Sequence, residues 1–126
     1  MILGLGTDIT EVPRIARSIE RFGERFLQRV YTPGEIAYCL ARRKSGAQSF
    51  AARFAAKEAG AKALGTGISH GVNWLELEVT RAPGHAPQLR LSGRAAARAQ
   101  QLGVTRISLS LTHTAETAIA IVVMES

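Results

Sequence analysis

Three charged residues could together hold a metal ion against a phosphorylated substrate. Asp8 ends an apolar N-terminal segment, and Glu58 and Lys62 follow much later in the chain. Two ionised carboxylates cannot lie close together without a compensating cation. Mg²⁺ would supply that cation, because it prefers oxygen ligands and is commonly held by one or two carboxylates with substrate phosphate. Lys62 would then lie beside the phosphates as a point charge.

Each of these residues also has a simpler interpretation. Glu58 and Lys62 are four positions apart, so on a helix they share a face and could form an ordinary surface salt bridge. Asp8 after a glycine could be a turn residue that ends a strand. A site is favoured by the small residues around Glu58, which allow a backbone or a ligand to approach closely: Ala55, Ala56, Ala59, Gly60 and Ala61.

The histidines and the cysteine offer less chemistry. His113 lies between two expected strands, where a histidine is commonly structural or exposed; the functional alternative is a phosphate donor or a proton-handling group. We interpret His70 and His85, in glycine-containing loops, as structural. Cys39 has no second cysteine for a disulfide and no clustered partners for zinc, so we expect it to be a buried helix residue.

Arg14, Arg17 and Arg21 form an arginine stripe on one side of an expected helix. The stripe is either a solvated helix face or a docking surface for an acidic helical partner. The net charge of +6 favours an acidic partner, which could be nucleic acid, a phosphorylated metabolite or an acidic protein. An aromatic content of 6% and the absence of an RNA-binding aromatic motif disfavour nucleic acid.

The elements that must position these residues begin with a strand. We expect residues 1–12 to be a strand in which Gly4 and Gly6 mark a bulge or the close approach of another group. Pro13 suits the first turn of a helix, and Gly23 should divide that region into two short helices. Apolar residues at helical spacing predict its core side: Ile15, Ile19, Phe22 and Phe26.

Two further helices follow. Thr32 and Glu35 predict a capping box and a helix that ends near Leu40 or Ala41. After a basic loop at 42–46, the alanine-rich segment 48–64 predicts a long helix that ends at Gly65.

The second half of the chain alternates between strands and one helix. We expect a helix over 92–102 and strands over 74–79, 89–91, 107–111 and 118–123. This order argues an α+β fold with a mainly antiparallel sheet packed against the long central helix and shorter helices. The 126 residues suit one domain, 1–126. No apolar run is long enough to span a membrane, and the N-terminus lacks the features of a signal peptide, so we expect the cytosol.

Segments that span nearly the whole chain resemble the motifs of the holo-[acyl-carrier-protein] synthases, the small class of 4′-phosphopantetheinyl transferases. The segments are Gly4–Arg14, Arg53–Ala59 with Lys62–Gly67, and Ser110–Thr114 with Ala118–Ala120. The second is the most specific, because its residue identities, its length and the lysine and glycine that follow all agree. Thr112 stands where many members have Ser, a change that keeps the hydroxyl.

The resemblance implies the fold of that family and transfer of 4′-phosphopantetheine from coenzyme A to a serine of apo acyl carrier protein, with release of adenosine 3′,5′-bisphosphate. It implies Mg²⁺ held by Asp8 and Glu58, catalysis by Glu58, Lys62 and His113, and docking of the carrier protein on the arginine stripe. It also implies a homotrimer with active sites between subunits, where Arg53 and the 43–44 loop meet the nucleotide end. Coenzyme A would contact Lys62, Arg53, Gly65, Thr112 and His113.

In that mechanism, Mg²⁺ and Lys62 would offset the charge of a pyrophosphate that otherwise repels the incoming alkoxide. Glu58 is the candidate base for the serine proton, either directly or through a metal-bound water. Two other functions stay open from the residues alone. One is a basic adaptor that binds acidic proteins or RNA without catalysis, and the other is a magnesium-dependent phosphohydrolase that uses water as the acceptor.

Overall fold

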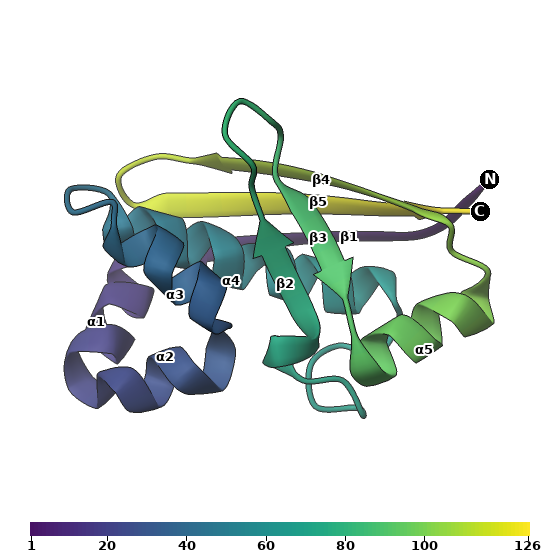
Figure 1. The fold of residues 1–126 in the computed structure, drawn as a ribbon, viewed down its shortest axis with the longest axis horizontal. Helices are drawn as coiled ribbons and strands as arrows, with labels where there is room; N and C mark the ends of the chain where they lie inside the picture. The colour runs from purple at the N-terminus through teal and green to yellow at the C-terminus, as the bar shows by residue number, and fades with distance from the viewer.

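A long buried helix lies between two antiparallel sheets in the computed structural model, which describes all 126 residues (Figure 1). The main sheet has the strand order β1-β5-β4, and the small sheet pairs β2 with β3. The strands are β1 (Ile2–Glu11), β2 (Leu77–Thr80), β3 (Gln88–Leu91), β4 (Arg106–His113) and β5 (Thr117–Glu125). The helices are α1 (Val12–Phe22), α2 (Glu24–Val30), α3 (Pro33–Leu40), α4 (Gly46–Ala63) and α5 (Gly93–Leu102). The expected α+β fold is confirmed.

Helix α4 is buried because both sheets pack against it. Its alanines share one core cluster with Val122 and Met124 of the main sheet and with Leu77 and Leu89 of the small sheet. A helix that is enclosed in this way carries small or apolar side chains all round instead of one apolar stripe. The alanine-rich sequence of α4 therefore reflects its central position.

Strand β1 lies unusually close to α4. A Cβ atom added at Gly4 would collide with the carbonyl oxygen of Ala63, and one added at Gly6 would collide with that of Ala59. The lack of a side chain at these two glycines therefore allows the backbone of α4 to pack closely against β1, one of the two roles that the sequence indicates. Alternate residues of a strand point to opposite faces, so Asp8 shares the α4-facing side with both glycines.

The N-terminal helices follow the prediction with one exception. Gly23, at φ +58°, separates α1 from α2, and Thr32 and Glu35 form the expected capping box of α3. Cys39 is fully buried. Phe22 is not a core residue, because α1 ends there and its side chain is 50% exposed.

Several element boundaries differ from the sequence prediction. Residues 74–76 form a 3₁₀ turn before β2, because the Asn73 side chain accepts a hydrogen bond from the Leu75 amide and caps the turn. Helix α4 begins at Gly46, ahead of the expected start at Gln48. His113 is the last residue of β4, paired with Ala118, and does not lie in the turn.

One face of the main sheet remains open to solvent, and we call it the outer sheet face. Its residues point away from α4: Leu5, Thr7 and Ile9 of β1, Ile119 and Ile121 of β5, and Ser108, Ser110 and Thr112 of β4. Ile9 is 67% exposed although it is a large apolar residue. None of the helices combines the length and the apolar character that crossing a membrane requires.

Candidate active site

The polar site lies where β1 crosses α4. Lys62 Nζ is 3.2 Å from Asp8 Oδ1 and donates a second hydrogen bond of 2.9 Å to the Thr7 carbonyl oxygen. Thr10 Oγ1 donates to the other carboxylate oxygen, Asp8 Oδ2, at 2.8 Å. Side-chain exposure is 51% for Lys62 and 17% for Asp8, so the site opens to solvent on the lysine side. The structure thus brings together residues that are far apart in the sequence.

Glu58 lies near this pair. Partial burial raises the pKa of the Glu58 carboxyl, and the negative charge of Asp8 raises it further, while Lys62 and Arg14 lower it. Asp8 is thus close enough for its negative charge to disfavour the charged form of Glu58. The simpler interpretation of Glu58 and Lys62 as an i, i+4 salt bridge is wrong, because Lys62 pairs with Asp8.

The donor set at this site fits Mg²⁺. Two repelling carboxylates gain from a cation between them, and Mg²⁺ is often bound by one or two carboxylates while phosphate and water complete its shell. The structure contains no group of three or more His, Cys, Asp or Glu side chains that could enclose a metal without a substrate. Asp8 and Glu58 would hold the ion, and this assignment stays a prediction.

We expect Gly6→Ala to damage this site selectively. The added Cβ would collide with the α4 backbone at Ala59 and push β1, with Asp8, away from Glu58. Gly34→Ala is the matched control, because a Cβ there meets no atom closer than 3.6 Å. Thermal unfolding and Mn²⁺ titration should show weaker metal binding and a lower Tm for Gly6→Ala only. Equal metal affinity in both variants would contradict the close-approach role of Gly6.

Arg14 takes part in this site as well as in the arginine stripe. Its guanidinium carbon lies 5.5 Å from the centre of the Phe54 ring, which in turn packs against Trp74. Its charge also acts on Glu58. The sequence indicated only the docking role, because proximity between α1 and α4 is a tertiary property.

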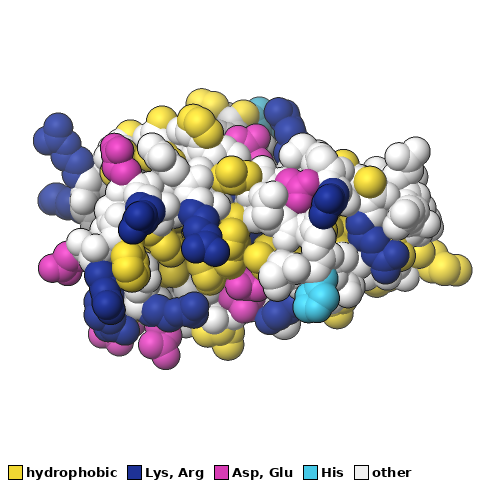
Figure 2. Space-filling view, turned by 90° about the horizontal axis from the view of Figure 1, so that it is seen from below, with side chains coloured by type: hydrophobic (Ala, Val, Ile, Leu, Met, Phe, Trp, Pro, Cys, Tyr) yellow, Lys and Arg dark blue, Asp and Glu magenta, His cyan; other side chains and the backbone are white.

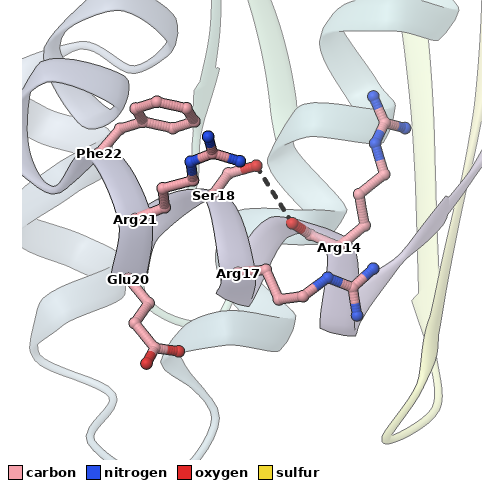
Figure 3. Close-up of a pocket in the computed structure, with 6 residues that line it drawn as sticks. All are labelled: Arg14, Arg17, Ser18, Glu20, Arg21 and Phe22. Atoms are coloured by element: carbon pink, nitrogen blue, oxygen red, sulfur yellow. Dashed lines mark hydrogen bonds between the residues drawn. The ribbon is translucent and has the colours of Figure 1, made fainter.

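The arginine stripe borders a shallow hollow on α1. The hollow has a volume of about 580 Å³, and its lining residues are Arg14, Arg17, Ser18, Glu20, Arg21 and Phe22 (Figure 3). In the close-up, Glu20 extends away from the guanidinium groups. The space-filling view shows basic side chains with hydrophobic ones between them on this face (Figure 2). The surface therefore combines positive charge with exposed apolar area.

Arg53 lies in α4, apart from the carboxylate pair. It is only 5% exposed, and its guanidinium carbon lies 4.0 Å from the centre of the Tyr38 ring. Its Nε has no hydrogen-bond partner. A buried guanidinium without a carboxylate partner is suited to an anionic ligand. The expected contact between Arg53 and a phosphate stays a prediction.

The remaining candidate residues do not converge in one chain. Gly65, at φ +79°, follows Lys62 at the end of α4, where its amide donates to the Lys62 carbonyl oxygen. Thr112 and His113 are consecutive in β4 and point to opposite sheet faces. Strand β5 lies between them and Asp8. One pocket within a single chain therefore cannot use the Thr112 and His113 side chains together.

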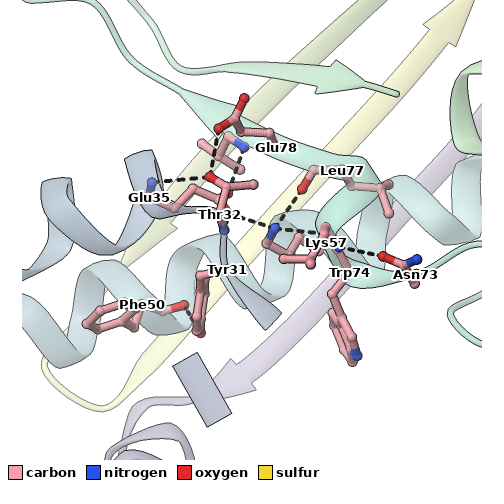
Figure 4. A network of polar contacts seen from close by, with 11 residues as sticks. Tyr31, Thr32, Glu35, Phe50, Lys57, Asn73, Trp74, Leu77 and Glu78 are labelled. Carbon is pink, nitrogen blue, oxygen red and sulfur yellow. Dashed lines mark hydrogen bonds and ion pairs between the residues drawn. The ribbon is translucent and has the colours of Figure 1, made fainter. Parts of the chain in front are cut away.

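One buried polar network was not predicted from the sequence (Figure 4). Lys57 Nζ lies 2.7 Å from Glu35 Oε1 and donates to the carbonyl oxygens of Trp74 and Leu77, and both charged side chains are fully buried. Glu35 also accepts hydrogen bonds from the amides of Thr32 and Val79. The sequence signal that could have indicated this network is a lysine, Lys57, among the alanines of the long expected helix. The network ties α3, α4 and β2 together directly beside Glu58.

Comparisons with known proteins point to one family over nearly the whole chain. Residues 4–122 match the family model of the 4′-phosphopantetheinyl transferase superfamily. The holo-[acyl-carrier-protein] synthase of Koribacter versatilis is 55% identical over 99% of both chains. The crystal structure of the Neisseria meningitidis synthase has a TM-score of 0.89 and 35% identity, with full coverage of both chains.

A further match is a complex. The Helicobacter pylori synthase with coenzyme A bound superimposes with a TM-score of 0.83 and 35% identity, covering 96% of this chain and 99% of the other. Sequence and structure therefore give the same assignment over nearly the whole length. The chain belongs to the holo-[acyl-carrier-protein] synthase family of the 4′-phosphopantetheinyl transferase superfamily.

Proposed function

We propose that this chain transfers 4′-phosphopantetheine from coenzyme A to a serine of apo acyl carrier protein and releases adenosine 3′,5′-bisphosphate. Family membership supports the reaction. The observation that carries the site assignment is the convergence of Asp8 from β1 with Glu58 and Lys62 from α4. A basic adaptor would not need that convergence, so it becomes the alternative outcome of the experiment below.

The proposed mechanism divides the work among these side chains. When bound by Asp8 and Glu58, Mg²⁺ would offset the negative charge of the pyrophosphate. Lys62 is exposed and can place its ammonium on the phosphates, which helps the bisphosphate to leave. Glu58 accepts the serine proton as the general base. His113 and Arg53 contribute phosphate contacts, with Thr112 and Gly65 lining the coenzyme A site.

The direct test is the intact mass of an apo acyl carrier protein after incubation with coenzyme A and the enzyme. We expect the carrier to gain one phosphopantetheine group with Mg²⁺ and none after chelation. Binding of the carrier without a mass change would favour the basic adaptor. Breakdown of coenzyme A without a carrier would favour the phosphohydrolase.

We further propose that the carrier protein docks on the arginine stripe. Arg17→Glu should raise the KM for the carrier protein about tenfold or more, because one reversed charge replaces attraction by repulsion, while the KM for coenzyme A changes little. Arg90→Glu, an exposed site on β3, is the control with the same charge change. Steady-state kinetics with each substrate varied would decide. An unchanged KM for the carrier in Arg17→Glu would contradict docking on the stripe.

A homotrimer with active sites between subunits is part of the proposal. The opposite directions of Thr112 and His113 support it, because a neighbouring chain could complete each pocket. The exposed apolar residues of the outer sheet face, Leu5, Ile9 and Ile121, suit a second copy of this chain, since exposed apolar patches commonly mark interfaces. That residues 1–126 act as one transferase domain, and that the enzyme works in the cytosol, also stay predictions.

We expect Ile9→Glu on the outer sheet face to produce a monomer. A charge buried in an interface is costly, so association should weaken strongly. Leu40→Glu is the control, since Leu40 is another exposed apolar residue that lies outside this face. Light scattering after size-exclusion chromatography would give the mass of each variant. A wild-type mass for Ile9→Glu would show that the subunits meet elsewhere.

A further inference from the structure

Thr10 is the buried partner of the metal-site carboxylate. Its Oγ1 donates a 2.8 Å hydrogen bond to Asp8 Oδ2, and the residue is only 1% exposed. Thr10 lies two positions after Asp8 on β1. Its backbone is held by pairing with Ala118 of β5. Its hydroxyl therefore stays beside the carboxylate whatever binds from the solvent side.

The two oxygens of Asp8 differ in how firmly they are held. Oδ1 contacts Lys62, whose side chain is half exposed and can move away toward a phosphate. Oδ2 accepts a hydrogen bond from a threonine hydroxyl that is buried in the sheet. One oxygen is therefore available for exchange, and the other is occupied by the protein.

We propose that Thr10 determines the metal selectivity of this site, because its hydrogen bond to Asp8 Oδ2 favours metal binding through Oδ1. The inference rests on the proposed magnesium site at Asp8 and Glu58. It assigns to Thr10 a positioning role, since the hydroxyl acts on the metal only through Asp8.

The physical basis is the difference between two common divalent ions. Mg²⁺ is small and demands octahedral geometry, whereas the larger Ca²⁺ accepts carboxylates that bind through both oxygens. A carboxylate with one oxygen engaged by a hydroxyl favours one-oxygen coordination and hence Mg²⁺. Hydrogen bonds to metal-binding carboxylates also orient them, and their loss typically lowers metal affinity by about 10- to 100-fold.

Thr10→Val and Thr10→Ser form a matched pair for the test. Val removes the hydroxyl and keeps a branched side chain suited to a strand, whereas Ser keeps the hydroxyl. Isothermal titration of the full chain with Mg²⁺ and with Ca²⁺, in the presence of saturating coenzyme A, gives the ratio of the two dissociation constants. Thermal unfolding of the same samples reports whether each variant is folded.

We expect Thr10→Val to bind Mg²⁺ about tenfold more weakly, with Ca²⁺ affinity unchanged or higher, so its preference for Mg²⁺ falls by at least that factor. Thr10→Ser should keep the wild-type ratio, and Thr10→Val should still unfold in one cooperative transition. Thr10→Ala is a second variant without the hydroxyl and should show the same loss of selectivity.

A wild-type ratio in a folded variant without the hydroxyl would overturn this role of Thr10 and leave the metal site intact. Loss of selectivity in Thr10→Ser as well would also overturn it, because the hydroxyl would then not be the cause. If the wild-type protein bound no Mg²⁺ at all, the proposed metal site would fail, and the inference about Thr10 would fail with it.

Discussion

Glu58→Gln is expected to lower the rate of phosphopantetheine transfer by about 10²- to 10⁴-fold, because the variant loses its general base. The amide also replaces one of the two carboxylates near Lys62, so metal binding should weaken. The change removes a charge and keeps the shape of the side chain. Single-turnover transfer to the carrier protein, followed by intact mass, would measure the loss.

The same substitution should not destabilise the fold at neutral pH. The pKa of Glu58 is raised in the folded chain by burial and by Asp8, so the charged form is disfavoured there. A raised carboxyl pKa means that the folded state binds the proton more tightly than the unfolded state, and stability falls as pH rises through the folded pKa. Glu58→Gln removes that cost, so its Tm at neutral pH should equal or exceed the wild-type value.

Glu24→Gln is the matched control for Glu58→Gln, because Glu24 is an exposed carboxylate at the start of α2, away from α4. It should transfer at the wild-type rate. Wild-type turnover by Glu58→Gln would defeat the site assignment. A large drop in the Tm of Glu58→Gln would instead show that its inactivity comes from the fold.

Lys57→Met is expected to lower the free energy of unfolding by about 3–5 kcal/mol, the usual cost of breaking a buried ion pair from one side. Glu35 would keep a buried negative charge without its partner, and the carbonyl oxygens of Trp74 and Leu77 would lose their donor. Urea denaturation followed by circular dichroism would measure the loss.

Lys44→Met is the control for the loss of a lysine, because Lys44 is exposed in the loop before α4. Its stability should stay near the wild-type value. The double variant Glu35→Leu with Lys57→Met removes both charges and should recover part of the loss, although Val79 would lack its acceptor. Wild-type stability of Lys57→Met alone would contradict a structural role for the pair.

These two predictions assign a structural role to Lys57 and a catalytic role to Glu58, its neighbour in α4. Lys57 points into the interior, where its partners fix α4 against α3 and β2. Glu58 lies at the edge of the site, where burial and the charge of Asp8 disfavour its ionised form. The network around Lys57 thus supports the segment that presents Glu58 to β1.

The sequence by itself determined the features that arise from short segments. Thr32 and Glu35 predicted the capping box of α3, and Gly23 predicted the break between α1 and α2, because these effects depend on neighbours within a few residues. The glycines of β1 indicated a close approach of backbone. The motif around Glu58 also predicted the family, since residue identity and spacing are properties of the sequence alone.

Only the tertiary structure decided which residues meet. It divided the strands into two sheets, buried Lys57 against Glu35, placed Arg14 beside Glu58, and turned Thr112 and His113 to opposite faces. It also showed that Lys62 pairs with Asp8 and not with Glu58. The physical reason is that strand pairing and helix burial depend on contacts between segments distant in the chain, which no local pattern encodes.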